Sequence, residues 1–214
     1  MPNPTKQELL ESVAPDYETD RLTFDGLRGD AKLHLAPDEL ERRLAALPPA
    51  PKDRGTLDYL VARTADFGRA CPSSVMLSVA GGLEGDRWVA QDKYGPEAQL
   101  ATARTDFARV IANGQALELH GDNLFLSLDL STENLPPGSR VRVGPALLEV
   151  TPKAHNGCKK WVQRFGLAPM RLNLAPHFAD RHLRGIYLRV IEAGVVRVGD
   201  EVRVVRRGPE ASVA

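Results

Sequence analysis

The sequence predicts a mainly β protein in which a closed β-barrel carries only a few helices. After about residue 50 the chain becomes a series of short apolar stretches, each bounded by turn-forming residues. Apolar residues at helical spacing are too rare for a fold of alternating β–α units. Closure into a barrel removes the exposed edges that so many short strands would leave in an open sheet.

The beginning of the chain has a different pattern. A capping box at Thr5–Glu8 precedes a short apolar face, and Pro37 suits the first turn of a second helix that carries Leu40, Leu44 and Leu47. The proline-rich stretch 48–53 ends this region and is typical of a linker. The predicted segments are a partly helical N-terminal extension at 1–50, a main domain at 51–206 and a C-terminal tail at 207–214.

Alternating and apolar stretches locate the elements of the main domain. Strands are expected at 56–61, 75–79, 124–130, 140–143, 146–150, 186–191, 195–198 and 202–205. Helices are expected at 100–112, ending at Asn113-Gly114, and at 159–165, ended by Gly166. Because the leucines at 124–130 alternate with mostly polar residues, that strand should be buried on one face only.

Composition excludes several classes of protein. Of the 214 residues, 28 are Lys or Arg and 28 are Asp or Glu, so the net charge is zero and non-specific nucleic-acid binding is not expected. The polar amino terminus does not have the form of a secretory signal, and no apolar run is long enough to span a membrane. Two cysteines cannot build a disulfide framework. We therefore expect a cytoplasmic protein.

The run 155–160, His-Asn-Gly-Cys-Lys-Lys, is the strongest candidate for chemistry. Gly157 allows a positive φ angle or a close approach of the backbone, which lets Cys158 point outward. Lys159, Lys160 and Arg164 would favour a thiolate, as would a helix that starts here. A thiolate ligates soft metals, attacks electrophiles or accepts a sulfane sulfur. The alternative for Cys158 is an inert, buried thiol, the role expected for Cys71.

Other chemistries fit the sequence less well. His155 and Cys158 have no second closely spaced pair to complete a zinc site. The glycine pattern of an NAD-binding turn and a Walker phosphate loop are both missing from the sequence. Gly85-Asp86-Arg87 could bind an anion through the arginine or could be a structural turn with an ion pair. Arg184, after Arg181 and His182, would by itself be a solvated basic residue.

Taken in order, these segments resemble the MOSC domain, the module at the carboxyl end of molybdenum-cofactor sulfurases. The matching stretches, over roughly residues 50–206, are Gly85-Asp86-Arg87, Gly121–Phe125, His155–Cys158, Leu183–Tyr187 and Gly194–Val202. The resemblance implies a β-barrel like the small domain of pyruvate kinase. One departure is Trp88, where many members carry histidine. The first fifty residues are too few for a sulfurase domain, so pyridoxal phosphate enters only as a family association.

The resemblance also implies roles for individual residues. Cys158 would ligate the molybdenum of a pterin cofactor, or would carry sulfur. The residues expected at the cofactor are Asp86, Arg87, His155, Asn156, Lys159, Arg164 and Arg184. Neither zinc nor NAD is expected, and neither a membrane nor a nucleic acid is expected as a partner.

Three functions follow from the resemblance. The first is a molybdenum-dependent reductase of N-hydroxylated or similar small substrates, which would need a separate electron-donor protein because the sequence has no iron–sulfur cluster motif. The second is a non-catalytic carrier that takes sulfane sulfur from a donor protein onto Cys158. The third is a cofactor-binding or interaction module without turnover.

Overall fold

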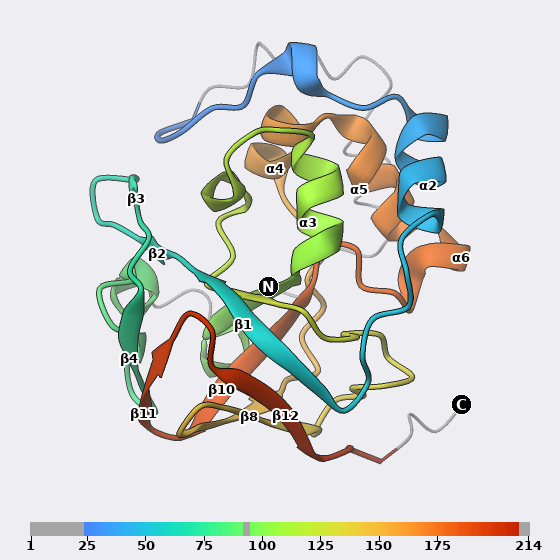
Figure 1. Cartoon of the computed structure of the whole chain (residues 1–214). Coiled ribbons are helices and arrows are strands. Elements are labelled where there is room, and N and C mark those ends of the chain that lie inside the picture. The colour runs from blue at the N-terminus through green and yellow to red at the C-terminus, as the bar shows by residue number, and fades with distance from the viewer. Residues whose placement is uncertain (1–23, 92–94, 210–214) are drawn as a thin grey trace.

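The computed structural model describes residues 24–91 and 95–209, and its central element is a closed barrel of seven strands (Figure 1). Around the barrel the strands follow the order β1 (Arg54–Leu60), β12 (Glu201–Arg206), β8 (Arg140–Val143), β9 (Ala146–Val150), β10 (Ile186–Glu192), β6 (Leu100–Arg104) and β7 (Leu124–Leu126). Neighbouring strands are antiparallel except β6 and β7. The predicted fold class is confirmed.

Leucine and valine fill the barrel. Leu57, Leu100, Leu124, Leu148 and Val202 come from five different strands, and each is at most 1% exposed. Burial of such side chains is worth about 1.5–3 kcal/mol each, so the barrel core is a major source of the fold's stability.

Two small sheets extend the barrel on one side (Figure 1). One contains β11 (Gly194–Arg197), β4 (Ser74–Ser78) and β5 (Gly82–Leu83). The other is a hairpin of β2 (Ala62–Arg63) and β3 (Arg69–Ala70). The turn of this hairpin contains Phe67, whose φ angle is positive. The hairpin brings two arginines, at 63 and 69, toward the end of the barrel where the helices lie.

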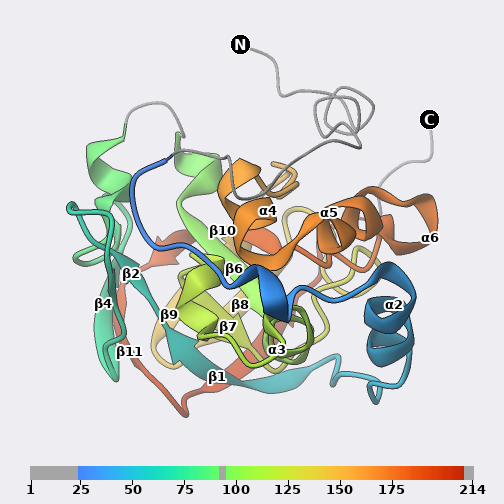
Figure 2. The same cartoon turned by 90° about the horizontal axis from the view of Figure 1, so that it is seen from above.

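The helices gather over one end of the barrel, as the view from above shows (Figure 2). They are α2 (Pro37–Ala45), α3 (Thr105–Ala112), α4 (Lys159–Phe165), α5 (Leu167–Leu174) and α6 (Pro176–Ala179). Short 3₁₀ helices are η2 (Ala31–Leu33), η3 (Arg87–Ala90), η4 (Pro96–Ala98) and η5 (Leu117–His120). Leu40 and Leu44 of α2 share a buried cluster with Phe107 and Trp161, so the extension packs into the same helical layer as the main domain.

The helix expected at 100–112 is wrong in its first five residues. Leu100–Arg104 is strand β6, and helix α3 begins only at Thr105. All five residues of β6 are buried, so neither face of the strand is solvated. Without a solvated face the strand shows no polar alternation, so apolar residues alone could not distinguish it from a helix. The left-handed end at Asn113-Gly114 is as expected.

The strand expected at 124–130 is also too long. Strand β7 ends at Leu126, although Leu128 and Leu130 still belong to the buried core. The pairing of β1 with β7 shifts register between Leu57 and Tyr59, which breaks the regular ladder. The alternation located the buried leucines correctly, but all three residues of β7 are buried, including Phe125, so the prediction of one solvated face fails for the strand itself.

Most other elements match their predicted positions. The hairpin β8–β9, strands β1, β4 and β10–β12, helix α4 and the proline-initiated α2 all form within a few residues of the predicted bounds. Helices α5 and α6 were not expected. The capping box at Thr5–Glu8 lies outside the described residues, and the two predicted boundaries between the three segments stay predictions.

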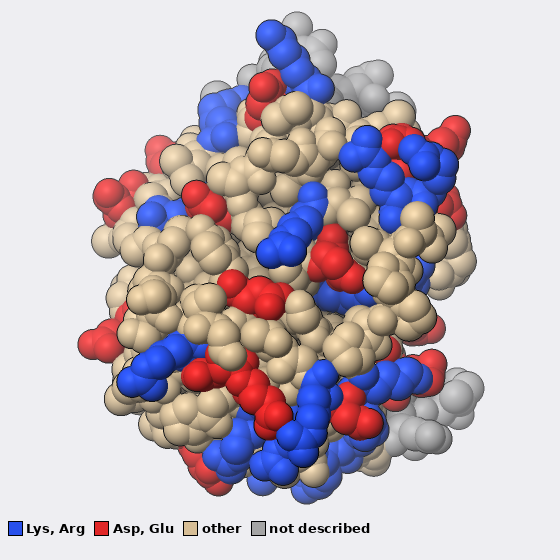
Figure 3. Space-filling model, in the orientation of Figure 1, with Lys and Arg blue, Asp and Glu red and all other residues tan. Residues whose placement is uncertain are grey.

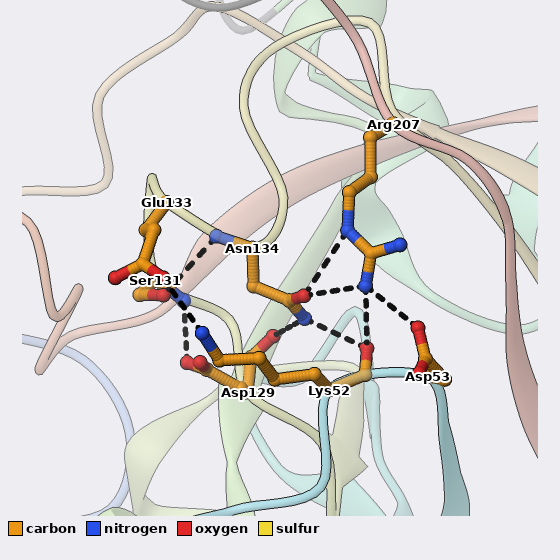
Figure 4. A network of polar contacts seen from close by, with 7 residues as sticks. All are labelled: Lys52, Asp53, Asp129, Ser131, Glu133, Asn134 and Arg207. Atoms are coloured by element: carbon orange, nitrogen blue, oxygen red, sulfur yellow. Dashed lines mark hydrogen bonds and ion pairs between the residues drawn. The ribbon is translucent and has the colours of Figure 1, made fainter.

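A polar network joins the segment that leads into the barrel to the segment that leaves it (Figure 4). The amide of Asn134 donates to the carbonyls of Lys52 (2.9 Å) and Asp129 (2.8 Å). Its oxygen accepts from Arg207 (2.8 Å), which also pairs with Asp53 (2.8 Å). The linker before β1 and the segment after β12 are thereby held at one loop.

Gly185 offers a test of the close packing between β10 and β6. Its φ angle is +99°, and a Cβ atom there would lie 2.0 Å from the carbonyl oxygen of Thr102. We expect Gly185→Ala to cost about 3 kcal/mol or more of unfolding free energy, through strain and overlap together. Gly199, with φ of +96° and no atom within 4 Å of the place that a Cβ would occupy, is the control. Its alanine variant should lose roughly 1–2 kcal/mol, from strain alone. Urea denaturation measures both losses, and equal losses would refute the packing argument.

Candidate functional site

The turn that follows η5 gathers three guanidinium groups. The last carbonyls of η5 accept hydrogen bonds in succession: Glu118 from Arg69 (3.1 Å), Leu119 from Arg164 (2.8 Å) and His120 from Arg184 (3.1 Å). Carbonyl oxygens at the end of a helical turn point outward and carry partial negative charge, so they attract cations. The three arginines come from β3, α4 and the segment before β10, and they meet only in the fold.

Gly121 makes this convergence possible. Its φ angle is +76°, and a Cβ atom there would lie 3.2 Å from Nη2 of Arg69 and 3.8 Å from Nη1 of Arg164. A larger residue would push the Arg69 guanidinium away from its present place. The turn therefore favours glycine for its backbone conformation and for the space beside it.

Asp122 neutralises part of this charge at the bottom of the site. Its side chain is fully buried and pairs with Nη1 of Arg184. Burial raises the pKa of Asp122, and the Arg184 guanidinium opposes the rise. Nδ1 of His155 lies 3.7 Å from the other carboxylate oxygen. Burial and then Arg184 hold the pKa of His155 well below its ordinary value, so this imidazole is neutral at pH 7. Its ring lies over that of Tyr187, with centroids 4.3 Å apart.

Asp86 holds a further arginine, the half-buried Arg63. Its carboxylate accepts from Nε (2.9 Å), Nη2 (2.8 Å) and the backbone N–H (2.7 Å) of Arg63. It also accepts from the amide of Asn123 (2.9 Å) and the N–H of Trp88 (2.8 Å), which lies in the first turn of η3. The sequence suggested Arg87 as the ion-pair partner of Asp86, but the structure shows Arg63 in that place. These contacts indicate that Asp86 positions the turn, while contact with a cofactor stays a prediction.

Cys158 is exposed immediately before the first turn of α4. Its backbone carbonyl accepts from the N–H groups of Trp161 (2.9 Å) and Val162 (3.1 Å). Gly157 has a φ angle of +86°, and a Cβ atom there would lie 3.0 Å from Met170 and 3.1 Å from Trp161. The glycine thus packs tightly against the helices while the next side chain faces outward, as the sequence predicted.

A group of basic side chains surrounds this thiol. Lys160 and Arg164 both interact electrostatically with Cys158, and Arg87 interacts with both cations. Burial lowers the pKa of Arg164 to about 10, and Arg69 adds to the effect. Burial also lowers the pKa of Lys160, with Arg87 and then Arg164 contributing. Mutual repulsion of this kind is relieved by a bound anion, so the group is suited to hold one.

Two phenylalanine rings make cation–π contacts with these cations. The ring of Phe67 lies 4.8 Å from the guanidinium of Arg87 and 5.4 Å from Nζ of Lys160. The ring of Phe24 lies 5.2 Å from the same Nζ and 5.7 Å from the guanidinium of Arg164. Cations within about 6 Å of an aromatic ring are attracted to its face.

Residues 24–30 run across α4 beside the site. The carbonyls of Asp25 and Leu27 accept from Lys160 (3.2 Å) and Arg164 (2.9 Å). The N–H of Gly29 donates to the side chain of Gln163 (3.0 Å). The extension thus contributes directly to the surroundings of the basic group, which its sequence did not indicate.

The structure brings most of the sequence-predicted residues together. Cys158, His155, Arg87, Arg164 and Arg184 share one region, and Arg184 is buried rather than solvated. Asn156 is half-buried in the loop, and Lys159 is exposed at the start of α4. Sequence reasoning missed Arg63, Arg69, Asp122, Asn123 and Tyr187 as site residues, whereas it had named Lys160 among the cations beside the thiol. Asp122 and Asn123 carried a signal in the motif Gly121–Phe125, and Tyr187 in the motif Leu183–Tyr187, but Arg63 and Arg69 carried none.

Cys71 is exposed, so the expectation of a buried structural thiol is wrong. It follows β3, a two-residue strand that ends at the exposed Ala70. Neither cysteine forms a disulfide.

Within residues 24–91 and 95–209, no three His, Cys, Asp or Glu side chains cluster as metal ligands. Every helix in these ranges is too short or too polar to cross a bilayer.

Parts of this chain are similar to known proteins. The family model for the MOSC domain matches residues 93–203. Among solved structures, YiiM from Escherichia coli is 23% identical, with 75% of this chain and 73% of that chain covered and a TM-score of 0.51. A hypothetical protein of known crystal structure is 21% identical, covering 73% and 69%, with a TM-score of 0.54. Both show likeness of fold.

A curated relative is the hemin import ATP-binding protein HmuV of Bordetella pertussis. It is 34% identical over 115 residues, which are 51% of this chain and 44% of that protein. The chain therefore spans less than half the length of the curated relative that it matches.

The Asp86–Arg63 pair predicts a pH-dependent stability. Burial would raise the pKa of Asp86, but hydrogen bonds from Arg63 outweigh it and hold the pKa below its ordinary 3.8. The pair therefore stabilises the fold fully above about pH 4, and this stability is lost as pH falls through the lowered pKa. At pH 7, Asp86→Asn should cost roughly 2–3 kcal/mol, because the half-buried Arg63 loses its counter-charge. The exposed Asp180→Asn is the control and should change little.

Thermal unfolding between pH 3 and pH 8 measures this effect. The difference between the Asp86→Asn variant and the unaltered protein should narrow below pH 4. A constant difference across that range would show that the charge of Asp86 contributes nothing.

Proposed function

We propose, because this chain belongs to the MOSC domain family, that it binds a molybdenum–pterin cofactor with Cys158 as the protein ligand of the metal. The single observation that carries the proposal is an exposed thiol at the edge of a buried cluster of arginines. A thiolate is a soft ligand suited to such a metal, and guanidinium groups are suited to the phosphate of a pterin cofactor.

The residues present fit such a group. Nη1 of Arg87 and Nε of Arg184 are buried and lack a hydrogen-bond partner among the described residues. Unpartnered buried donors cost stability, typically about 1–3 kcal/mol each, so an incoming acceptor would recover that energy. Arg69 and Arg164 are already oriented by the carbonyls of η5. Phosphate oxygens would therefore meet donors held in place before binding, which lowers the entropic cost.

The proposed activity is the reduction of a small N-hydroxylated or similar substrate. When bound, the cofactor would supply the two-electron chemistry. Conversion of an N-hydroxyl group to an amine and water consumes two electrons and two protons, and a separate donor protein would deliver the electrons. The chain's own part would be to hold the anionic end of the cofactor, to present Cys158 and to keep a neutral His155 beside Asp122 at the bottom of the site.

Replacement of Cys158 tests the metal-binding proposal. Protein made in a host that synthesises the cofactor should contain molybdenum, and Cys158→Ala should lower the metal content by more than about tenfold. Cys71→Ala removes the other exposed thiol and is the matched control. Elemental analysis measures the metal without relying on activity. Equal molybdenum content in all three proteins would refute ligation by Cys158.

Sulfur carriage is a second candidate, favoured by the exposure of Cys158, which a partner's thiol could reach. A donor persulfide would transfer its outer sulfur to the Cys158 thiolate. One S–S bond breaks, one forms, and the donor leaves as a thiolate, so no further oxidant is needed. The neighbouring cations would stabilise the thiolate of Cys158 before the transfer and the thiolate of the departing donor after it.

A module that binds the cofactor without turnover is the third possibility, and it predicts metal content without reductase activity.

Intact-mass measurement tests sulfur carriage. After incubation with a cysteine desulfurase and cysteine, the protein should gain the mass of one sulfur atom, which a reductant removes. The gain should persist in Cys71→Ala and vanish in Cys158→Ala. A gain that follows Cys71 instead would refute the carrier role of Cys158.

A further inference from the structure

Six arginines lie on the outer surface of the barrel, away from the Cys158 site. They are Arg54 of β1, Arg203 and Arg206 of β12, Arg140 and Arg142 of β8, and Arg189 of β10, together called the arginine face. In Figure 3, Lys and Arg side chains gather on the lower part of the molecule, over β12 and β8. The helices and the Cys158 loop are at the opposite end of the barrel (Figure 1).

Strand register places several of these arginines directly opposite one another. Arg203 pairs with Arg54 on one side and with Arg142 on the other. Arg206 pairs with Arg140 in the next row. Like charges in opposite positions of neighbouring strands destabilise a sheet. The fold therefore gains nothing from three arginines in one row, and another constraint has to account for them.

Nearby glutamates balance only half of this charge. Glu201 pairs with Arg54 (2.6 Å), Glu192 with Arg142 (2.9 Å), and Glu149 bridges Arg140 (3.0 Å) and Arg189. Arg203 reaches Glu201 only at 4.0 Å. Six arginines thus face three glutamates, which leaves an excess of three positive charges on one surface of a chain whose net charge is zero.

These side chains are accessible. The side chain of Arg54 is 66% exposed, and those of Arg203 and Arg189 are each 48% exposed. Exposed ion pairs contribute little to stability, so their glutamates can be exchanged for the carboxylates of another molecule at small cost. The planar guanidinium binds a carboxylate through two parallel hydrogen bonds.

We propose that the arginine face is a docking surface for a protein with an acidic patch. The interleaved glutamates favour a protein over a nucleic acid, because they would repel a continuous phosphate backbone, whereas a protein can place carboxylates singly between them. The chain's zero net charge also removes the general attraction that non-specific nucleic-acid binding requires. The proposal does not depend on what Cys158 binds.

Replacement of the central row tests this proposal. The face variant is Arg54→Gln, Arg142→Gln and Arg203→Gln in one protein. The control variant removes the same charge from exposed positions on α2, α3 and α5, through Arg42→Gln, Arg109→Gln and Arg171→Gln. The probes are labelled poly-glutamate, a DNA duplex that carries the same number of charges, and phosphatidylglycerol vesicles.

Fluorescence anisotropy, or sedimentation for vesicles, at low salt gives the affinities. Poly-glutamate should bind the unaltered protein and lose about tenfold or more in affinity with the face variant, but less than about twofold with the control. If both variants lost the same affinity for poly-glutamate, binding would depend on net charge alone, and the proposal would be overturned. Tighter binding of DNA or of vesicles through the same arginines would also overturn it, because the partner would then be of another class.

Thermal unfolding shows whether a loss of poly-glutamate binding comes from lost contacts or from a damaged fold. The face variant should melt at the same temperature as the unaltered protein or higher, because the opposed charges are removed. A clearly lower melting temperature would show that the arginines serve the fold, and the proposal would fail.

Discussion

The turn from Gly121 to Asn123 is the constraint on which the rest of the site depends. Its carboxylate and amide groups, with the carbonyls just before it, hold arginines that arrive from four separate segments of the chain. A buried guanidinium group costs stability unless a counter-charge or hydrogen bonds compensate for its lost hydration. Asp122 pairs with Arg184, while Asn123 joins Asp86 and through it Arg63. Since β7 starts immediately after this turn, the barrel and the charged site share one anchor, and displacement of one would displace the other.

Two layers of charge result, with different physical roles. The lower layer, around Asp122 and Asp86, pairs Arg184 and Arg63 with carboxylates, and these pairs fix the positions of the two arginines. The upper layer, around Lys160 and Arg164, meets the backbone carbonyls of residues 24–30, which orient the cations without cancelling their charge. Repulsion within the upper layer is a cost that the folded chain carries until an anion arrives. This arrangement explains why an exposed cysteine beside it is suited to a charged cofactor or to an ionised sulfur species.

Sequence reasoning succeeded where a residue type has one dominant physical explanation. Gly157 and Gly166 at the ends of a helix, Pro37 at the start of another, and the turn between β8 and β9 could all be located from the chain alone. It failed where burial is complete, as in β6, because a strand enclosed on both sides has no polar alternation. It also failed for Arg63 and Arg69, which lie on two-residue strands with no pattern. Their importance comes from partners that are distant in sequence. For Arg63 these partners are Asp86, 23 residues away, and Asn123, 60 residues away.

Zero net charge concealed the way in which charge is distributed. Equal numbers of acidic and basic residues describe the whole chain, yet cations concentrate at the Cys158 site and again on the outer barrel. Composition is a sum over the molecule, whereas binding responds to the local potential, which falls off within about 10 Å at ordinary ionic strength. The strand register creates the second concentration, because side chains far apart in sequence become direct neighbours across β1, β12 and β8. A balanced composition therefore argues against a uniform attraction for polyanions but leaves room for two separate, local anion-binding surfaces on one small barrel.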